Sequence, residues 1–176
     1  MVCAGLHGAK GDMQMTGNPH RYTFNHTMLR VKDARASLAF YRDILGMTLL
    51  RQLDFEEGRF SLYFLAFLNQ GEALPLDEAD AREYIFSRQG VLELTHNWGT
   101  EEEDGPVYHN GNSEPRGYGH IGVAVPDVAE ACRRFEEAGV TFVKRPEDGR
   151  MKHIAFIADP DGYWVEILSA RGMAGR

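Results

Sequence analysis

The sequence predicts an α+β fold made of two βαβββ modules, each contributing a curved mixed sheet. Two observations predict it. First, the stretch from His26 to Asp33 aligns with the stretch from His120 to Asp127, because both begin with His, alternate apolar residues and end with Asp. Second, each Asp is followed by a helical pattern and then by three β-rich segments. Such self-similarity indicates two copies of one supersecondary unit.

The first copy begins with a strand from His26, since apolar residues alternate over six positions. Asp33 lies where a helix N-cap belongs, and a helical pattern runs from Ala34 to Leu45 until Gly46 ends it. Its apolar stripe contains Leu38, Tyr41 and Leu45. Three further strands are expected at Met47–Asp54, Phe60–Phe67 and Val91–Asn97.

The second copy repeats this order. Its strand begins at His120, and its helix runs from Val128 to Ala138 and ends at Gly139. The apolar stripe of this helix contains Val128, Cys132 and Phe135. Its three further strands are expected at Thr141–Arg145, His153–Ala158 and Tyr163–Ser169.

These elements divide the chain into five parts. We expect a flexible N-terminal tail at 1–21, a first module at 22–98, a connecting loop at 99–117, a second module at 118–169 and a C-terminal tail at 170–176. The first module carries an inserted segment at 69–89 with a short helix around Asp77–Ser87. Because long connections in a compact domain are often functional or mobile, the Gly-rich loop at 99–117 is of interest.

Composition excludes several classes of protein. The net charge of −7 argues against nucleic acid as a partner. No apolar stretch approaches the length of a membrane span, and the first residues lack the apolar region of a signal peptide. Only Cys3 and Cys132 are present, which favours a reducing compartment, so a cytoplasmic location is expected. The acidic runs at Asp77–Glu83 and Glu101–Asp104 are interpreted as solvated surface.

Strand periodicity brings out four candidate metal ligands. Side chains at alternate positions share a face, so His26 and His120 should lie on the concave faces, opposite the apolar residues that the helices cover. Glu93 and Glu166 lie in the same way in the last strand of each module. A lone His or Glu in a strand is usually structural, but the recurrence of both types at matched places favours a metal site.

The predicted site is a single divalent ion held by two imidazoles and two carboxylates, a ligand set that suits Zn²⁺, Ni²⁺, Co²⁺, Mn²⁺ or Fe²⁺. Gly122 and Ala124, on the same face as His120, leave room for a ligand. The remaining histidines lack this repeated pattern and are interpreted as surface or structural residues: His7, His20, His96, His109 and His153.

Several longer motifs carry further information. They lie at Thr27–Asp33, Phe40–Tyr41, Leu45–Leu49, Phe60–Ala66, Leu92–Thr100, Gly111–Gly122 and Asp159–Ile167. Together they resemble glyoxalase I, the lactoylglutathione lyase family of the vicinal-oxygen-chelate superfamily, and the resemblance covers roughly Tyr22 to Leu168. The resemblance implies a glyoxalase-like fold, with the two modules enclosing a metal cleft. It also implies isomerisation of the methylglyoxal–glutathione hemithioacetal to S-D-lactoylglutathione through a metal-bound enediolate.

The resemblance also assigns roles to residues. The Glu that matches Glu166 is the base in this family, and the Glu that matches Glu93 is a ligand or serves the opposite face of the substrate. Glutathione would contact a polar set: Arg30, Thr95, Asn97, Arg116, Lys144 and Arg150. The S-side or methyl end of the substrate would lie in an apolar set, whose alternative role is plain core: Phe60, Leu62, Phe64 and Met151.

The metal and the assembly follow from the same resemblance. Some members carry Gln where this chain has His26, which leaves the metal more open, but the insert and the long connection resemble the Zn²⁺-dependent branch. Zn²⁺ is therefore expected, with Ni²⁺ or Co²⁺ as alternatives. The family also implies a homodimer, in which His26 and Glu93 of one chain meet His120 and Glu166 of the other.

Four other functions share parts of this pattern. Extradiol dioxygenases and fosfomycin-resistance transferases use three protein ligands, whereas all four positions are filled here. A coenzyme A thioester epimerase would share the acid–base logic, but the motifs around Asn97 and Arg116 indicate glutathione. Binding or resistance proteins of this superfamily usually lack the metal ligands.

Overall fold

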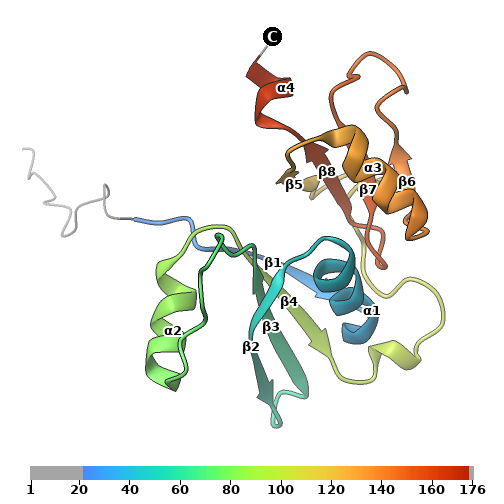
Figure 1. Cartoon of the computed structure of the whole chain (residues 1–176). Helices are drawn as coiled ribbons and strands as arrows, with labels where there is room; N and C mark the ends of the chain where they lie inside the picture. Colours follow the sequence, from blue (N-terminus) through green and yellow to red (C-terminus); the bar gives the residue numbers. More distant parts are fainter. Residues whose placement is uncertain (1–21, 175–176) are drawn as a thin grey trace, which may run out of the picture.

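The computed structural model describes residues 22–174, in which the two predicted modules form separate four-stranded sheets (Figure 1). The first sheet has the strand order β1-β4-β3-β2, with β1 parallel to β4 and the other pairs antiparallel. The elements of the first module are β1 (His26–Val31), α1 (Ala34–Leu38), β2 (Thr48–Phe55), β3 (Phe60–Ala66) and β4 (Val91–Asn97).

The second sheet has the equivalent order, β5-β8-β7-β6, and again its first and last strands are parallel. Its elements are β5 (His120–Ala124), α3 (Val128–Glu137), β6 (Phe142–Lys144), β7 (Ala155–Ala158) and β8 (Trp164–Leu168). The predicted duplication of a βαβββ unit is therefore confirmed.

The predicted helix starts are also confirmed. Asp33 accepts hydrogen bonds from the backbone N–H groups of Arg35 and Ala36, and Asp127 accepts one from Glu130. These caps satisfy donors that the first helical turn leaves free. Gly46 and Gly139 follow the two helices with φ angles of 86° and 71°, a conformation that glycine adopts without steric cost.

The first helix does not stay regular up to Leu45, as the sequence predicts. After α1 the chain widens into a π-helical segment at Ala39–Ile44, where the N–H of Leu45 donates to the carbonyl of Phe40. The wider turn keeps two adjacent aromatic rings, Phe40 and Tyr41, both buried. A single apolar stripe at α-helical spacing does not predict this π-helical segment.

Two smaller predictions are wrong. The expected C-terminal tail forms a short helix, α4 (Ala170–Ala174), where the hydroxyl of Ser169 accepts from the N–H of Gly172. His153 precedes β7 rather than beginning it. The predicted N-terminal tail at 1–21 lies outside the described residues.

The insert and the connection hold short helices. The insert forms α2 (Glu78–Ser87), which matches the predicted short helix and is capped by Asp77. The connection contains one 3-10 turn, η3 (Thr100–Glu102). In Figure 1, α1 and α2 lie on opposite sides of the first sheet. Within residues 22–174, no helix is long and apolar enough to span a bilayer.

One hydrophobic core runs through both modules. It includes Leu29 and Leu94 from the first sheet together with Val123 and Ile167 from the second. Two polar contacts, one buried and one partly buried, also join the modules. The hydroxyl of Tyr41 donates to Asp159 at 2.8 Å, and the backbone N–H of Lys32 donates to Asp161 at 3.0 Å. The two sheets are therefore held in one packed body.

Candidate metal and substrate site

The exposed face of each first strand carries the predicted histidine. In β1, His26, Met28 and Arg30 are exposed, whereas Leu29 and Val31 are buried. In β5, His120, Gly122 and Ala124 are exposed and Val123 is buried. Helices α1 and α3 cover the buried faces, so both histidines lie on the faces opposite these two helices.

The first half-site is the pair His26 and Glu93. The Nε2 atom of His26 lies 3.2 Å from Oε2 of Glu93. Asn25 fixes the ring from the other side, because its Oδ1 lies 2.7 Å from His26 Nδ1. The amide of Asn25 is itself oriented, since its Nδ2 donates to the carbonyls of Ile85 and Arg88 at 2.8 Å each.

This orientation determines the tautomer of His26. Asn25 Oδ1 can only accept, so Nδ1 must carry the proton, and Nε2 of the neutral ring then holds a lone pair. That lone pair faces a carboxylate oxygen of Glu93. Two acceptors at this distance repel each other unless a cation lies beside both or the ring gains a second proton. The first half-site therefore fits a metal ion, with Asn25 as the residue that orients its imidazole ligand.

The second half-site is the pair His120 and Glu166, with Nε2 and Oε2 3.3 Å apart. The His120 ring packs edge-on against Phe156, with centroids 5.1 Å apart. Gly122 lies opposite Glu166 in the sheet, and a Cβ atom added there would lie 3.8 Å from Glu166 Oε2. The small residue thus keeps the approach to this carboxylate open.

The structure does not bring the four candidate ligands together in one chain. Among residues 22–174, no group of three or more His, Cys, Asp or Glu side chains is close enough to hold one ion. Each half-site offers one imidazole and one carboxylate, which is half of the predicted ligand set. A complete four-ligand site therefore requires a first half-site and a second half-site to meet, which they do not do within the described part of one chain.

Most candidate substrate contacts of the first module surround the first half-site. Cross-strand pairing sets Phe64 beside Glu93, Leu62 beside Thr95 and Phe60 beside Asn97, and Arg30 pairs with Thr95 from β1. The side chain of Asn97 donates to the hydroxyl of Tyr108, in the connecting loop, at 2.8 Å. Phe64 is 2% exposed and also belongs to a small core beneath α2, so its alternative role as core holds as well.

The candidates of the second module are more scattered. Lys144 pairs with Phe156, whose other neighbour is Glu166, but its ammonium donates to the carbonyls of Arg145, Met151 and Ile154. Met151 and Arg150 are exposed in the segment before β7. Arg116 is exposed in the connecting loop and pairs with Glu114. Within residues 22–174, none of these four side chains forms a hydrogen bond or ion pair with Glu166.

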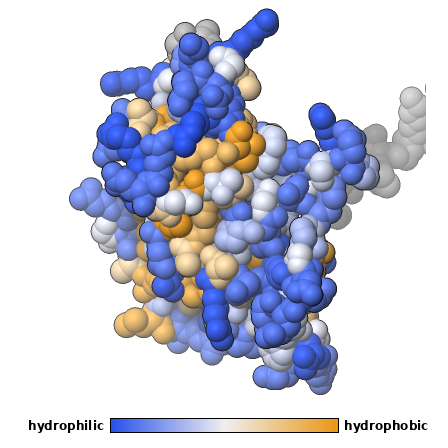
Figure 2. Space-filling model, turned by 90° about the vertical axis from the view of Figure 1, so that its right-hand side faces the viewer, coloured by the Kyte–Doolittle hydropathy of each residue, from blue (hydrophilic) through white to orange (hydrophobic). Residues whose placement is uncertain are grey.

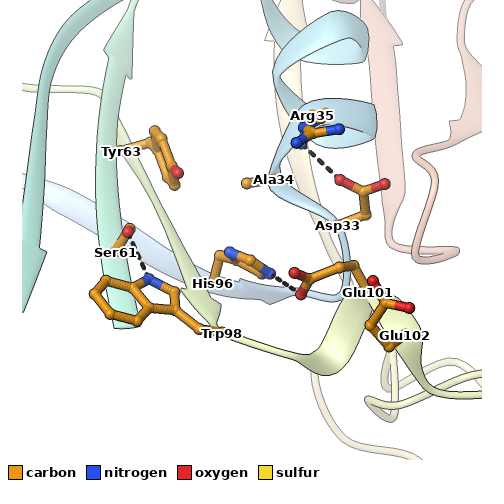
Figure 3. Close-up of a pocket in the computed structure, with 9 residues that line it drawn as sticks. All are labelled: Asp33, Ala34, Arg35, Ser61, Tyr63, His96, Trp98, Glu101 and Glu102. Carbon is orange, nitrogen blue, oxygen red and sulfur yellow. Dashed lines mark hydrogen bonds and ion pairs between the residues drawn. The ribbon is translucent and has the colours of Figure 1, made fainter. Parts of the chain in front are cut away.

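A separate cavity of about 340 Å³ lies on the opposite face of the first sheet (Figure 3). There His96, 9% exposed, directs Nε2 at Glu101 over 2.8 Å, and the indole of Trp98 donates to Ser61. Hydrogen bonds from backbone N–H groups, and then the one with His96, lower the pKa of Glu101. None of the candidate ligands lines this cavity, and the interpretation of His96 as a surface or structural residue stays a prediction.

Comparison with known proteins decides the family. The model of the Glyoxalase/Bleomycin resistance protein/Dioxygenase superfamily matches residues 23–167. A lactoylglutathione lyase of Pseudomonas aeruginosa is 63% identical over 158 residues, which cover 88% of each chain. The chain belongs to the lactoylglutathione lyase family. A second lactoylglutathione lyase, from Pseudomonas putida, is 55% identical and covers 84% of this chain and 85% of its own.

A solved member of the lactoylglutathione lyase family shares the fold. The trypanothione-dependent glyoxalase I of Leishmania major superposes with a TM-score of 0.63 at 30% identity, covering 88% of this chain and 91% of its own. The resemblance inferred from motifs is thereby confirmed, as is the mixed α+β architecture. Sequence reasoning missed Asn25, because it precedes the strand and so falls outside the alternating pattern.

Proposed function

We propose that the protein isomerises the hemithioacetal of methylglyoxal and glutathione to S-D-lactoylglutathione. The observation that carries this proposal is the pair of matched His–Glu half-sites, at 3.2 and 3.3 Å, in a chain 63% identical to a lactoylglutathione lyase. The dioxygenase and binding-protein alternatives need fewer ligands or none, so the four-residue pattern disfavours them.

The ligand set would be His26, Glu93, His120 and Glu166, with Zn²⁺ as the expected ion and Ni²⁺ or Co²⁺ as alternatives. Imidazole and carboxylate ligands suit all three ions. When bound, the ion supplies Lewis-acid stabilisation of the negative charge that develops on the two substrate oxygens.

The chain's own residues would bind the substrate and move the proton. The carboxylate of Glu166 takes the proton from the thiohemiacetal carbon and returns one to the neighbouring carbon. Arg30, Asn97 and Arg116 bind the glutathione part, since a guanidinium matches a carboxylate in shape and charge. Phe60 and Leu62 contact the methyl end and exclude water from it.

The proposed assembly is a homodimer with its two sites at the subunit interface. Support comes from the separation of the half-sites within one chain. A cavity of about 550 Å³ beside His120 is lined by exposed apolar residues, among them Phe24, Phe67 and Tyr118. Figure 2 also shows an apolar patch within a largely hydrophilic face. Patches of this kind mark surfaces that a partner covers.

The proposed location is the cytoplasm. The substrate contains glutathione, whose thiol persists in reducing compartments. Cys132 is a free, buried thiol.

The decisive experiment is metal replacement combined with a change of the base. We expect metal-free protein to be inactive with methylglyoxal and glutathione, and Zn²⁺ or Ni²⁺ added separately to restore thioester formation. Glu166→Gln should lower kcat at least about a hundredfold, because general-base catalysis is worth that much. Glu130→Gln, exposed on α3, is the matched control. Activity with neither metal, or near-normal turnover of Glu166→Gln, would refute the proposal.

A further inference from the structure

A cavity of about 330 Å³ lies between α2 and the strands β2 and β3. It adjoins the first half-site, because Phe64, which lines it, pairs with Glu93 on β4 and with Arg51 on β2. Neighbouring strands are about 4.8 Å apart, so Arg51 rises from the sheet roughly 10 Å from Glu93. The apolar wall of this distal cavity comprises Leu53, Phe55, Phe64, Ile85 and Phe86.

One cation is partly buried in this wall. The Arg51 side chain is 20% exposed, and its Nη2 donates to Oε1 of Glu78 at 2.6 Å. Its Nε is buried and has no hydrogen-bond partner among the described residues. A buried donor that lacks an acceptor is costly, so an acceptor delivered by a ligand would be favoured there.

The charges around the cavity leave a positive excess. Arg82 donates to the same oxygen of Glu78 at 2.8 Å, so two guanidinium groups share one carboxylate. Asp54 also borders the cavity, but its carboxylate accepts from Gln52 and Ser61. Those residues belong to the other face of the sheet, since side chains alternate along β2. On this face of the sheet, an anionic group would therefore meet two guanidinium groups that share one carboxylate.

We propose that the distal cavity receives the far end of the aldehyde part of the substrate. Arg51 there selects 2-oxoaldehydes that carry a carboxylate on an aromatic or short aliphatic chain. The apolar wall accommodates the chain, and the planar guanidinium binds the carboxylate through the nitrogens that Glu78 leaves free. This inference rests on the proposed function and extends its substrate class.

Selectivity in the metal-loaded enzyme tests the proposal. The measurement is kcat/KM for the glutathione adducts of 4-carboxyphenylglyoxal and phenylglyoxal, expressed as a ratio. Arg51→Gln should lower this ratio about tenfold, which is the lower range for a hydrogen bond to a charged group. Arg51→Lys should retain part of it, and Arg82→Gln, on an arginine with a 61% exposed side chain, should change it less than about twofold.

Glu78→Gln distinguishes substrate selection by Arg51 from a structural role of Arg51. Arg51→Gln and Glu78→Gln break the same ion pair between β2 and α2. If that ion pair only supports the fold, both changes should shift the kcat/KM ratio alike. If Arg51 binds the substrate carboxylate, Glu78→Gln removes a competing anion and should keep or raise the ratio. An unchanged ratio in Arg51→Gln, or an equal fall in both variants, would overturn the proposal.

Binding without turnover distinguishes this proposal from the proposed function. Calorimetry would compare the affinities of S-(4-carboxybenzyl)glutathione and S-benzylglutathione in the wild type and the same variants. A protein that turns over neither of these adducts nor the methylglyoxal adduct would refute the lyase proposal, and the affinity ratio would still test Arg51. Normal turnover without any preference for the carboxylate would refute only the role of Arg51.

Discussion

Asn25 determines which nitrogen of His26 faces the candidate site. Its amide lies between two carbonyls near the end of α2 and the Nδ1 atom of the ring, so it can be oriented in only one way. His120 shows no equivalent bond to its Nδ1 atom among the described residues and is held by packing against Phe156. At the scale of single residues, the two half-sites are therefore matched in their ligands but not in how the imidazole is supported.

This difference predicts the effect of removing Asn25. Loss of a partner that orients a metal ligand typically costs ten- to a hundredfold in metal affinity. We expect Asn25→Ala to weaken Zn²⁺ binding by about that much, measured by competition with a chelator. Asn25→Asp keeps an acceptor for His26 but loses the donors to the two carbonyls. It should therefore bind Zn²⁺ more tightly than Asn25→Ala, and equal losses would indicate a purely structural role.

At the scale of elements, the turn before β8 ties the second module to the first. Oδ1 of Asp159 accepts from the N–H groups of Asp161 and Tyr163, and its Oδ2 accepts from Tyr41, which follows α1. Burial raises the pKa of Asp159 to about 6, although these hydrogen bonds lower it. Burial also raises the pKa values of Asp161 and Tyr163.

The raised pKa of Asp159 predicts how stability depends on pH. The folded protein holds this proton up to about pH 6, whereas the unfolded chain releases it near the ordinary value of 3.8. The resulting stabilisation is complete below pH 3.8 and is lost as the pH rises through 6. Its size is on the order of 3 kcal/mol, given that one pKa unit corresponds to 1.36 kcal/mol.

Asp159→Asn should remove this dependence, because an amide keeps an acceptor for the two N–H groups and does not ionise. Urea unfolding at pH 4.5 and pH 7.5, at one protein concentration, would measure it. The variant should lose less stability than the wild type between these two pH values. Asp43→Asn, on an exposed carboxylate, is the control. Equal losses in Asp159→Asn and the wild type would contradict the prediction.

Local sequence patterns predict helices, strands and the buried faces of strands more reliably than they predict tertiary contacts. Alternation in β1 and β5 predicts which side of each strand is buried, because α1 and α3 each cover one face of these strands. The π-helical segment after α1 is invisible to a 3.6-residue period. The position of α2 beside Arg51 and Asn25 depends on tertiary packing of the insert, which no local pattern encodes. Arg116 illustrates the same limit, since its place in an exposed loop does not follow from its motif.

At the scale of the whole molecule, the separation of the half-sites decides where a complete metal site can form. His26 and Glu93 lie on the first sheet, His120 and Glu166 on the second, and the described chain does not gather them. We propose that the apolar cavity beside His120 belongs to the surface that a second copy would cover. In a dimer with twofold symmetry, both sites would combine a first half-site from one chain with a second half-site from the other.

Mixing two inactive variants tests this arrangement. His26→Ala damages the first half-site and His120→Ala the second, so both homodimers should be inactive. In a mixed dimer with shared sites, one site receives both damaged halves and the other receives both intact halves. After random exchange half of the dimers are mixed, so activity should recover to about a quarter of the wild type. Mixing His26→Ala with Glu93→Gln, which damage the same half-site, should restore nothing. If mass spectrometry shows exchange and no activity returns in the first mixture, the sites are not shared between subunits.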